Sequence, residues 1–244
     1  MLFLLPLVIA LSAAESPDAD TVARQCDAAL KGKTQIGAAS MTVHTPDWER
    51  TLEMKFWYDY PDKTLIRITA PAKEAGSGTL RLGSNMWMYL PSVERVIKVP
   101  PSLMLQSWMG SDFTNDDLAK ESSLPTDYTH SIDGETTVDG DACYRLVAIP
   151  KSNAPIVWGK LVLLVRKSDF LPRRQEYYDE HGTLEKVLSF DQIRRAGSRN
   201  YPMHWRMVSV RKPGHQTDLT FSSLEFDAPV PPGIFNQRNL ERRF

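Results

Sequence analysis

The chain has 244 residues, of which 42% are apolar and 24% are charged, and its formal net charge at pH 7 is −1. This composition is ordinary for a globular protein, and the length fits one large β domain or two small ones. Basic and acidic residues are mixed along the chain, which argues against a nucleic-acid-binding protein that uses a basic face.

The first 14 residues, "MLFLLPLVIALSAA", are apolar and uncharged. This run is too short to span a bilayer comfortably and is typical of the apolar region of a signal peptide. Small Ser12 and Ala14 suit a cleavage site before Glu15, so we expect export with cleavage near Ala14 and one domain over residues 15–244. The positive n-region is missing, which suggests a truncated start, and a short membrane anchor is the alternative.

One helix is predicted after the linker, before the pattern changes to period two. Asp20 is a plausible N-cap and Gly32 ends the helix. Its apolar residues recur at helical spacing: Val22, Cys26, Ala29 and Leu30.

Residues 41–100 read as a series of strands with one apolar face. The apolar positions alternate with Glu53, Lys55, Arg67 and Arg81, which we expect to face water. The apolar face comprises Leu52, Met54, Phe56, Ile66, Ile68, Leu80, Leu82, Met86 and Met88. In "NMWMYL" both faces are apolar, so the register of that strand could be reversed.

The stretch "PPSLMLQSWMGSDF", residues 100–113, is unusually rich in large apolar side chains. They are Leu103, Met104, Leu105, Trp108, Met109 and Phe113. Burial of one such side chain stabilises a protein by about 1.5–3 kcal/mol, so either the protein core or a ligand must cover them. Helical spacing favours a short helix here, and Thr114 with Asp117 resembles a capping box that begins a second one.

The second half returns to strands separated by clear turn signals. These are Asp133-Gly134, Asp139-Gly140, Ser168-Asp169, His181-Gly182 and Pro213-Gly214. The whole chain therefore predicts roughly ten antiparallel strands, an N-terminal helix and a helical insertion in the middle, in a single all-β domain.

Catalytic and metal-binding patterns are missing from the sequence. Ser77 and Ser111 stand outside any nucleophile-elbow pattern, and the five histidines lack metal-binding spacing. The acidic cluster at 112–117 fits a helix cap better than a calcium loop. We therefore expect no enzyme, no metal and no cofactor.

Two features leave alternatives open. Cys26 and Cys143 could form a disulfide in an oxidising compartment or remain two buried free thiols. Methionine is adaptable and is common on promiscuous binding surfaces, so a methionine cluster beside Trp87 and Trp108 fits either a core filler or a lipid-sized cavity. The cluster comprises Met54, Met86, Met88, Met104 and Met109.

The segments "WMYLP", "SWMGSDFTNDDL" and "VWGKLVLLVRKSDFLPRRQEYYDEHG" closely resemble the LolA-like outer-membrane lipoprotein-sorting proteins. The resemblance extends from about residue 20 to the C-terminus. It implies a strongly curved antiparallel sheet, a half-open β-barrel, whose concave face is plugged by the N-terminal helix and the mid-chain insertion. The apolar strand face would then point to the concave side.

The resemblance also implies a periplasmic carrier that moves a lipoprotein or another lipid between the two membranes. Its acyl chains would lie in the concave cavity, delivered by an inner-membrane exporter of the resistance-nodulation type or by an ABC transporter. We expect Leu103, Met104, Trp108 and Met109 to line this cavity together with the apolar strand face, and residues 103–113 to move when cargo binds. The alternatives are a non-transport adaptor of an envelope complex and a lipid hydrolase.

Overall fold

A computed structural model of the chain describes residues 17–119, 123–152, 154 and 156–241. The predicted signal peptide, residues 1–14, lies outside these residues. In the described part of the chain, every helix is too short or too polar to cross a membrane.

Thirteen strands form one antiparallel sheet, which exceeds the roughly ten strands predicted. In the first half they are β1 Thr34–His44, β2 Glu49–Asp59, β3 Lys63–Ala70, β4 Gly78–Leu82, β5 Asn85–Leu90 and β6 Arg95–Lys98. In the second half they are β7 Tyr128–Val138, β8 Asp141–Pro150, β9 Lys160–Arg166, β10 Pro172–Tyr178, β11 Leu184–Ala196, β12 Arg199–Ser209 and β13 Gln216–Phe226. The turn predicted at Asp133-Gly134 is instead an irregularity inside β7, where Gly134 has φ 82° and the pairing with β8 shifts.

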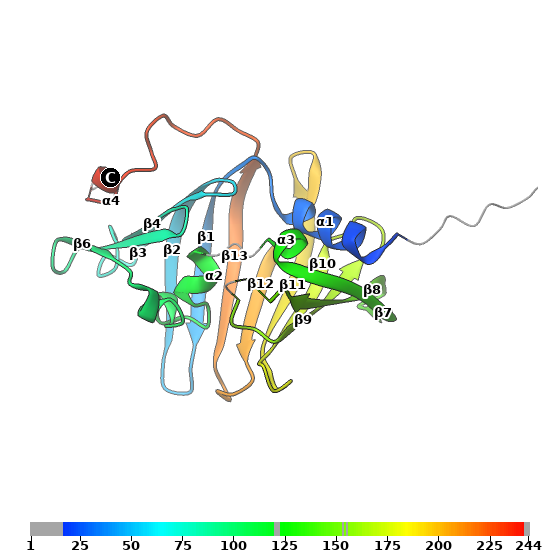
Figure 1. Cartoon of the computed structure of the whole chain (residues 1–244). Coiled ribbons are helices and arrows are strands. Elements are labelled where there is room, and N and C mark those ends of the chain that lie inside the picture. Colours follow the sequence, from blue (N-terminus) through cyan, green and yellow to red (C-terminus); the bar gives the residue numbers. More distant parts are fainter. Residues whose placement is uncertain (1–16, 120–122, 153, 155, 242–244) are drawn as a thin grey trace, which may run out of the picture.

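The sheet consists of two meanders joined in its centre. The strand order is β6-β5-β4-β3-β2-β1-β13-β12-β11-β10-β9-β8-β7, so β1 pairs with β13 and the edges are β6 and β7. The sheet curves strongly without closing, which confirms the half-open barrel (Figure 1). Because β6 and β7 are consecutive in the chain but lie at opposite edges, the segment between them, described over residues 99–119 and 123–127, crosses from one edge to the other.

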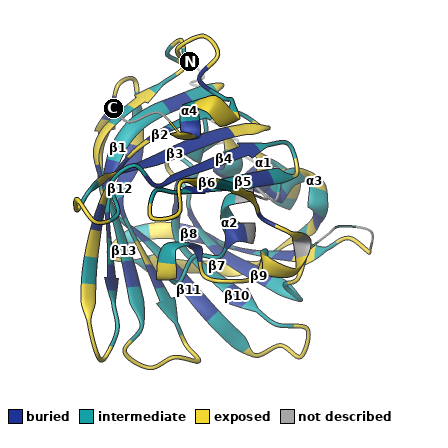
Figure 2. Cartoon of the chain, turned by 90° about the vertical axis from the view of Figure 1, so that its left-hand side faces the viewer, coloured by how far each residue is buried: buried dark blue, intermediate teal, exposed yellow. Residues whose placement is uncertain are grey.

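This crossing segment lies in front of the concave face, as Figures 1 and 2 show. It contains two 3-10 turns and two short helices: η1 Pro101–Leu103, η2 Trp108–Gly110, α2 Asn115–Ala119 and α3 Leu124–Asp127. The prediction of a short α-helix around Trp108 was therefore wrong, because the structure has two separate 3-10 turns there. The two prolines before it and the left-handed conformation of Met109 (φ 52°) break any regular α-helix.

The N-terminal helix α1 Ala19–Leu30 packs on the concave face, as predicted. Its N-cap is Asp18, whose carboxylate accepts a hydrogen bond from the Thr21 amide at 2.7 Å. Asp20, the predicted cap, lies in the first turn and contacts His130 of β7 at 2.7 Å. Val22, Ala23 and Cys26 are buried against the second meander.

The C-terminal segment covers part of the convex face. It ends in α4 Gln237–Glu241, whose Leu240 is fully buried with Leu65 of β3 and Leu80 of β4. Gly78 permits this packing, because a β-carbon there would lie 2.8 Å from a methyl group of Leu240. Strands β3 and β4 are therefore buried on both faces.

Candidate functional site

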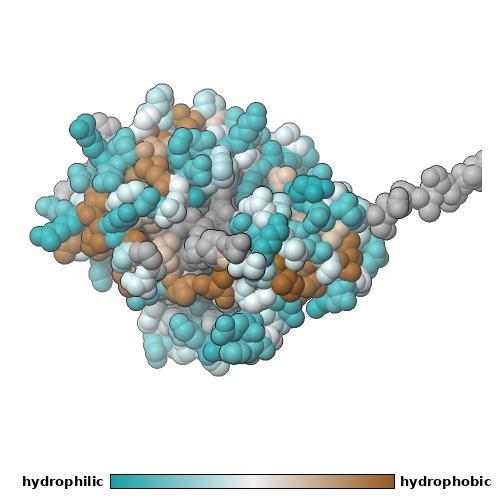
Figure 3. All heavy atoms as spheres, in the orientation of Figure 1, coloured by the Kyte–Doolittle hydropathy of each residue, from teal (hydrophilic) through white to brown (hydrophobic). Residues whose placement is uncertain are grey.

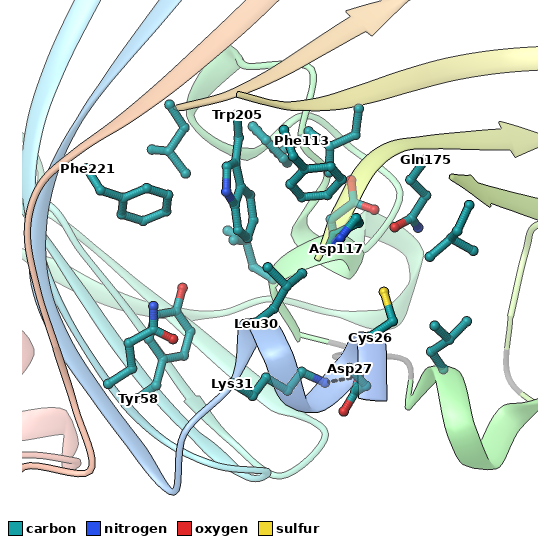
Figure 4. A pocket seen from close by; sticks show the side chains of 18 of the residues that line it. Cys26, Asp27, Leu30, Lys31, Tyr58, Phe113, Asp117, Gln175, Trp205 and Phe221 are labelled. Carbon is teal, nitrogen blue, oxygen red and sulfur yellow. Dashed lines mark hydrogen bonds and ion pairs between the residues drawn. The ribbon is translucent and has the colours of Figure 1, made fainter. Parts of the chain in front are cut away.

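An apolar cavity lies between the concave face of the sheet and the elements that cover it. It has a volume of about 280 Å³ and is lined by residues of α1, the crossing segment and both meanders. Figure 4 shows Leu30, Phe113, Trp205 and Phe221 converging on this space from different elements. The lining is predominantly apolar, which suits a hydrophobic ligand rather than a reacting polar substrate.

Four of the predicted residues line the cavity directly: Met54, Phe56, Ile66 and Trp108. Six others belong to the same concave core cluster without lining the cavity. They are Leu52, Ile68, Met86, Met88, Met104 and Met109. Period-two alternation thus identified the concave face of β2 and β3 and also that of β5.

The prediction was wrong for Leu80 and Leu82 of β4. Strand pairing places Leu80 opposite Leu65 and Trp87, and these residues form the convex cluster beneath the C-terminal segment. Leu82 packs against the same cluster. The cause is the second apolar layer on the convex side, which makes the leucines of β4 face away from the cavity.

Arg67 and Arg81, which were expected to face water, are 4% and 5% exposed. Arg67 lies on the convex side of β3, and burial lowers the pKa of its guanidinium. Arg81 donates hydrogen bonds to the carbonyls of Pro61 and Gly83 at the end of the sheet. Their burial follows from the double coverage of β3 and β4.

The apolar stretch 103–113 is partly buried by the protein and partly exposed to solvent. Trp108 is 3% exposed, whereas Leu103 and Leu105 are 38% and 57% exposed. Two large apolar residues near the β6 edge are also exposed: Val93, just before the strand, and Ile97 within it. Figure 3 shows hydrophobic side chains at the surface of the face that carries α2 and α3.

A small number of polar contacts holds the crossing segment on the sheet. The Trp108 Nε1–H donates to Thr79 Oγ1 of β4 at 3.0 Å, and Arg50 of β2 donates to the Met109 carbonyl. At the next turn the Asp112 amide donates to Thr217 Oγ1 of β13 at 2.9 Å, and that hydroxyl donates to the Asp112 carboxylate at 2.8 Å.

Helix α2 is held by an ion pair. Lys186 Nζ of β11 lies 2.8 Å from Asp117 Oδ2, and the two side chains are 9% and 16% exposed. Asp117 also completes the predicted capping box. Its carboxylate accepts from the Thr114 amide at 2.8 Å, and its own amide donates to Thr114 Oγ1 at 3.1 Å.

A second ion pair borders the cavity on α1, where Lys31 Nζ lies 2.7 Å from Asp27 Oδ1 (Figure 4). Asp27 belongs to α1 and Lys31 caps the C-terminus of that helix, so the pair lies within one continuous segment and is preserved wherever the crossing segment lies. The Asp117–Lys186 pair differs because it joins the crossing segment to the sheet.

The aromatic lining that comes from β11, β12 and β13 of the second meander was not predicted from the sequence. The rings of Trp205 and Phe221 lie 5.4 Å apart, and Phe190 and Tyr201 contact Trp205 at 5.2 Å and 6.1 Å between centroids. Tyr201, Trp205 and Met207 alternate along β12, which is the signal that could have identified them.

The structure decides between the two alternatives for the cysteines, because both are free and buried. Cys26 lies on α1 in the concave core, while Cys143 of β8 points to the opposite side of the sheet from its neighbours Tyr144 and Leu146, which belong to that core. The sheet separates the two thiols, so the possible disulfide is not formed. Burial raises the pKa of both thiols, well above its usual range for Cys26.

The described residues hold no group of three or more His, Cys, Asp or Glu side chains that could bind a metal ion. Ser77 and Ser111 are buried turn residues, and the Ser111 hydroxyl donates to the Trp108 carbonyl at 2.7 Å. The site is therefore an apolar cavity with two ion pairs at its border.

A protein-family model whose description reads "uncharacterized protein" matches residues 61–242. The chain belongs to this family. Among curated proteins, none matches the chain.

Three solved structures match the fold over nearly the whole chain. A DUF1329 family protein from Desulfovibrio piger is 26% identical, with 91% of this chain and 97% of that chain covered at a TM-score of 0.83. A structure described as an outer-membrane lipoprotein-sorting protein domain, from Vibrio parahaemolyticus, is 23% identical, with 91% and 98% covered at a TM-score of 0.80. A LolA superfamily protein from Nitrosomonas europaea is 21% identical, with 92% and 100% covered at a TM-score of 0.75. The resemblance to LolA-like proteins is thus confirmed, and this chain has the LolA-like fold.

Proposed function

We propose that the protein is a periplasmic carrier that binds the acyl chains of a lipoprotein or another envelope lipid. The observation that supports this function best is an apolar cavity beneath a segment that crosses between the two free edges of the sheet. Such a lining can bind a hydrophobic ligand. The fold is also that of a protein described as a lipoprotein-sorting domain. Delivery by an inner-membrane exporter and transfer to the outer membrane belong to the same proposal.

The cavity must enlarge before it can hold a whole acyl chain with its head. Its volume of about 280 Å³ lies at the lower limit of small-molecule pockets, which measure about 300–1,000 Å³. The crossing segment is the element that can leave. It covers the cavity with Trp108, Phe113 and Leu118, and its described residues are held on the sheet by apolar packing and a few local polar contacts.

A reversible carrier requires the closed and the loaded states to have similar free energies. An acyl chain gains about 0.8 kcal/mol per buried CH₂, so ten methylenes contribute about 8 kcal/mol. A neutral hydrogen bond contributes about 0.5–1.5 kcal/mol and a charged one about 1.5–3 kcal/mol. The polar contacts through Trp108, Met109, Asp112 and Asp117 therefore sum to a similar amount, and the apolar contacts that Trp108, Phe113 and Leu118 lose must be replaced by contacts with the lipid.

The test is direct analysis of bound lipid. The protein is purified without detergent from a periplasmic extract, organic solvent removes any ligand, and mass spectrometry identifies it. We expect acyl-chain lipid at a stoichiometry near one, or stoichiometric uptake when the empty protein meets lipid vesicles. A protein that neither contains nor takes up acyl lipid would contradict the carrier and support the adaptor alternative.

A further inference from the structure

Lys186 is a buried cation on the concave face, at the border of the cavity. It belongs to β11 with Leu188 and Phe190, two cavity residues on the same side of the strand. Its ammonium group lies 4.9 Å from the ring centre of Trp158 and 5.4 Å from that of Tyr177. Both rings line the cavity, and the whole residue is 7% exposed.

The charge of Lys186 is balanced by the crossing segment. In the described part of the chain, its ion-pair partner is Asp117 of α2, at 2.8 Å. Two aromatic faces provide a favourable quadrupole but no formal negative charge. A buried cation that loses its counter-ion is strongly unfavourable, so displacement of α2 would leave Lys186 in need of another anion.

We infer that Lys186 binds an anionic group of the cargo, which replaces the Asp117 carboxylate when the crossing segment is displaced. This inference rests on the proposed carrier function and adds a chemical class to it. The preferred ligand is an acyl lipid with a phosphate or carboxylate next to its chains, not a neutral acylglycerol. Acyl chains can replace the apolar contacts that the crossing segment makes with the cavity, whereas only an anion can replace the Asp117 carboxylate beside Lys186.

The Lys31–Asp27 pair provides the matched comparison within the same cavity. Lys31 lines the cavity and is paired at 2.7 Å, but its partner Asp27 lies four residues earlier in the same segment of the chain. Displacement of α2 leaves this pair intact, so the charge of Lys31 stays balanced by Asp27 and needs no anion from a ligand. A general attraction of anions to the cavity would involve both lysines, and the exchange mechanism would involve Lys186 alone.

The experiment measures binding of three single-chain probes by competition with an environment-sensitive fluorescent fatty-chain dye. The probes are 1-palmitoyl lysophosphatidate, palmitate and monopalmitoylglycerol, which carry a phosphate, a carboxylate and no charge. We expect the wild-type protein to bind at least one anionic probe about tenfold more tightly than the neutral probe, which corresponds to about 1.4 kcal/mol. The two anionic probes show whether phosphate or carboxylate is the preferred source of charge.

Lys186→Met should lower the ratio of anionic to neutral affinity to about one. The ratio is the readout, because loss of the ion pair that holds α2 changes access to the cavity for all three probes alike. Lys186→Arg should restore the preference, and this variant guards against a defect in folding. Asp117→Asn should strengthen anionic binding, because the competing carboxylate is removed. Lys31→Met should lower the ratio of affinities less than Lys186→Met does. Lys167→Met is the control, because Lys167 pairs with Glu135 outside the cavity lining, and it should leave the ratio at its wild-type value.

The possible failures are distinguishable. If none of the probes binds, the proposed carrier function fails. If all three bind with equal affinity, or if Lys186→Met and Lys31→Met lower anionic binding equally, the carrier function stands and the role of Lys186 is overturned.

Discussion

Trp108 combines two roles that usually exclude each other, because it is buried like a core residue and lies on the segment proposed to move. The residue is 3% exposed, and its indole N–H donates to Thr79 Oγ1 at 3.0 Å. Trp108→Phe keeps most of the packing and removes the donor, so we expect a loss of about 1 kcal/mol in unfolding free energy and faster lipid uptake. Trp108→Ala should cost about 3–5 kcal/mol, as for a core aromatic.

Trp57→Phe is the matched control for Trp108, since this residue packs in the convex cluster on the opposite face of the sheet. Urea unfolding and the rate of dye uptake measure the two effects. A Trp108→Phe protein that unfolds at lower urea but takes up lipid at the wild-type rate would contradict the role of Trp108 in closing the cavity.

At individual positions, the sequence was informative wherever one face of a strand meets water. Met54 and Phe56 alternate with exposed Glu53 and Lys55, and both were correctly assigned to the concave face. The same rule failed at Leu80, because a segment more than 140 residues later in the chain covers the convex side of β4. Alternation identifies an apolar face, but it cannot show that the other face is also covered.

The crossing segment is the element whose displacement the carrier requires, so its attachment can be tested directly. Asp112 and Thr217 are joined by two hydrogen bonds, which makes them suitable for an engineered disulfide, Asp112→Cys with Thr217→Cys. The native thiols of Cys26 and Cys143 are buried. We expect the oxidised variant to stay folded and to lose most of its lipid uptake, with recovery on reduction.

Non-reducing electrophoresis verifies the engineered bond, and dye uptake before and after dithiothreitol measures its effect. Each single cysteine variant serves as a control for the loss of the hydrogen bonds. Equal uptake by the oxidised and reduced forms would show that residues near Asp112 need not move.

The C-terminal segment provides a second element-level prediction, on the convex side. Gly78→Ala should destabilise the protein by about 1–3 kcal/mol, because the added methyl group would lie 2.8 Å from a methyl of Leu240. Leu240→Ala should cost about 2–5 kcal/mol by leaving a cavity. The double variant should cost less than the sum, since alanine at 240 makes room for alanine at 78.

Thermal unfolding of the four proteins gives the coupling energy of this cycle. Additive costs would mean that Leu240 does not pack on β4 in solution. The sequence offered no indication of this contact beyond a proline-rich tail, because the pairing of a short apolar helix with a distant glycine depends on tertiary structure.

For the whole molecule, local pattern and overall topology were predictable to different degrees. Turn signals such as Asp139-Gly140 and Pro213-Gly214 fall between the strands that the structure contains. The pairing of β1 with β13, which joins the two meanders, has no local signal, because its partners are about 180 residues apart. The half-open barrel therefore came from the family resemblance, and the position of the crossing segment follows from this topology.

The pH dependence of stability is a property of the whole sheet, since several carboxylates on its strands and turns have lowered pKa values. Burial alone would raise the pKa of Asp218, but hydrogen bonds from Arg206, Gln216 and His204 outweigh it and hold the pKa below its ordinary value. Asp169 shows the same balance, with burial opposed by hydrogen bonds from Arg166. Such groups stabilise the fold above their unfolded pKa of about 4.

As the pH falls from about 4 through the lower folded-state values, this stabilisation is lost, so we expect the unfolding free energy to fall in that range. Asp218→Asn should cost about 1–2 kcal/mol at pH 7, where the carboxylate accepts charged hydrogen bonds, and should reduce the slope below pH 4. Asp47→Asn, in the exposed β1–β2 turn, is the control and should change neither. Urea unfolding followed by tryptophan fluorescence between pH 7 and 3 measures both quantities. An unchanged slope in Asp218→Asn would show that the carboxylate has the same pKa in the folded and unfolded chains, and that its contacts on the convex face contribute little to stability.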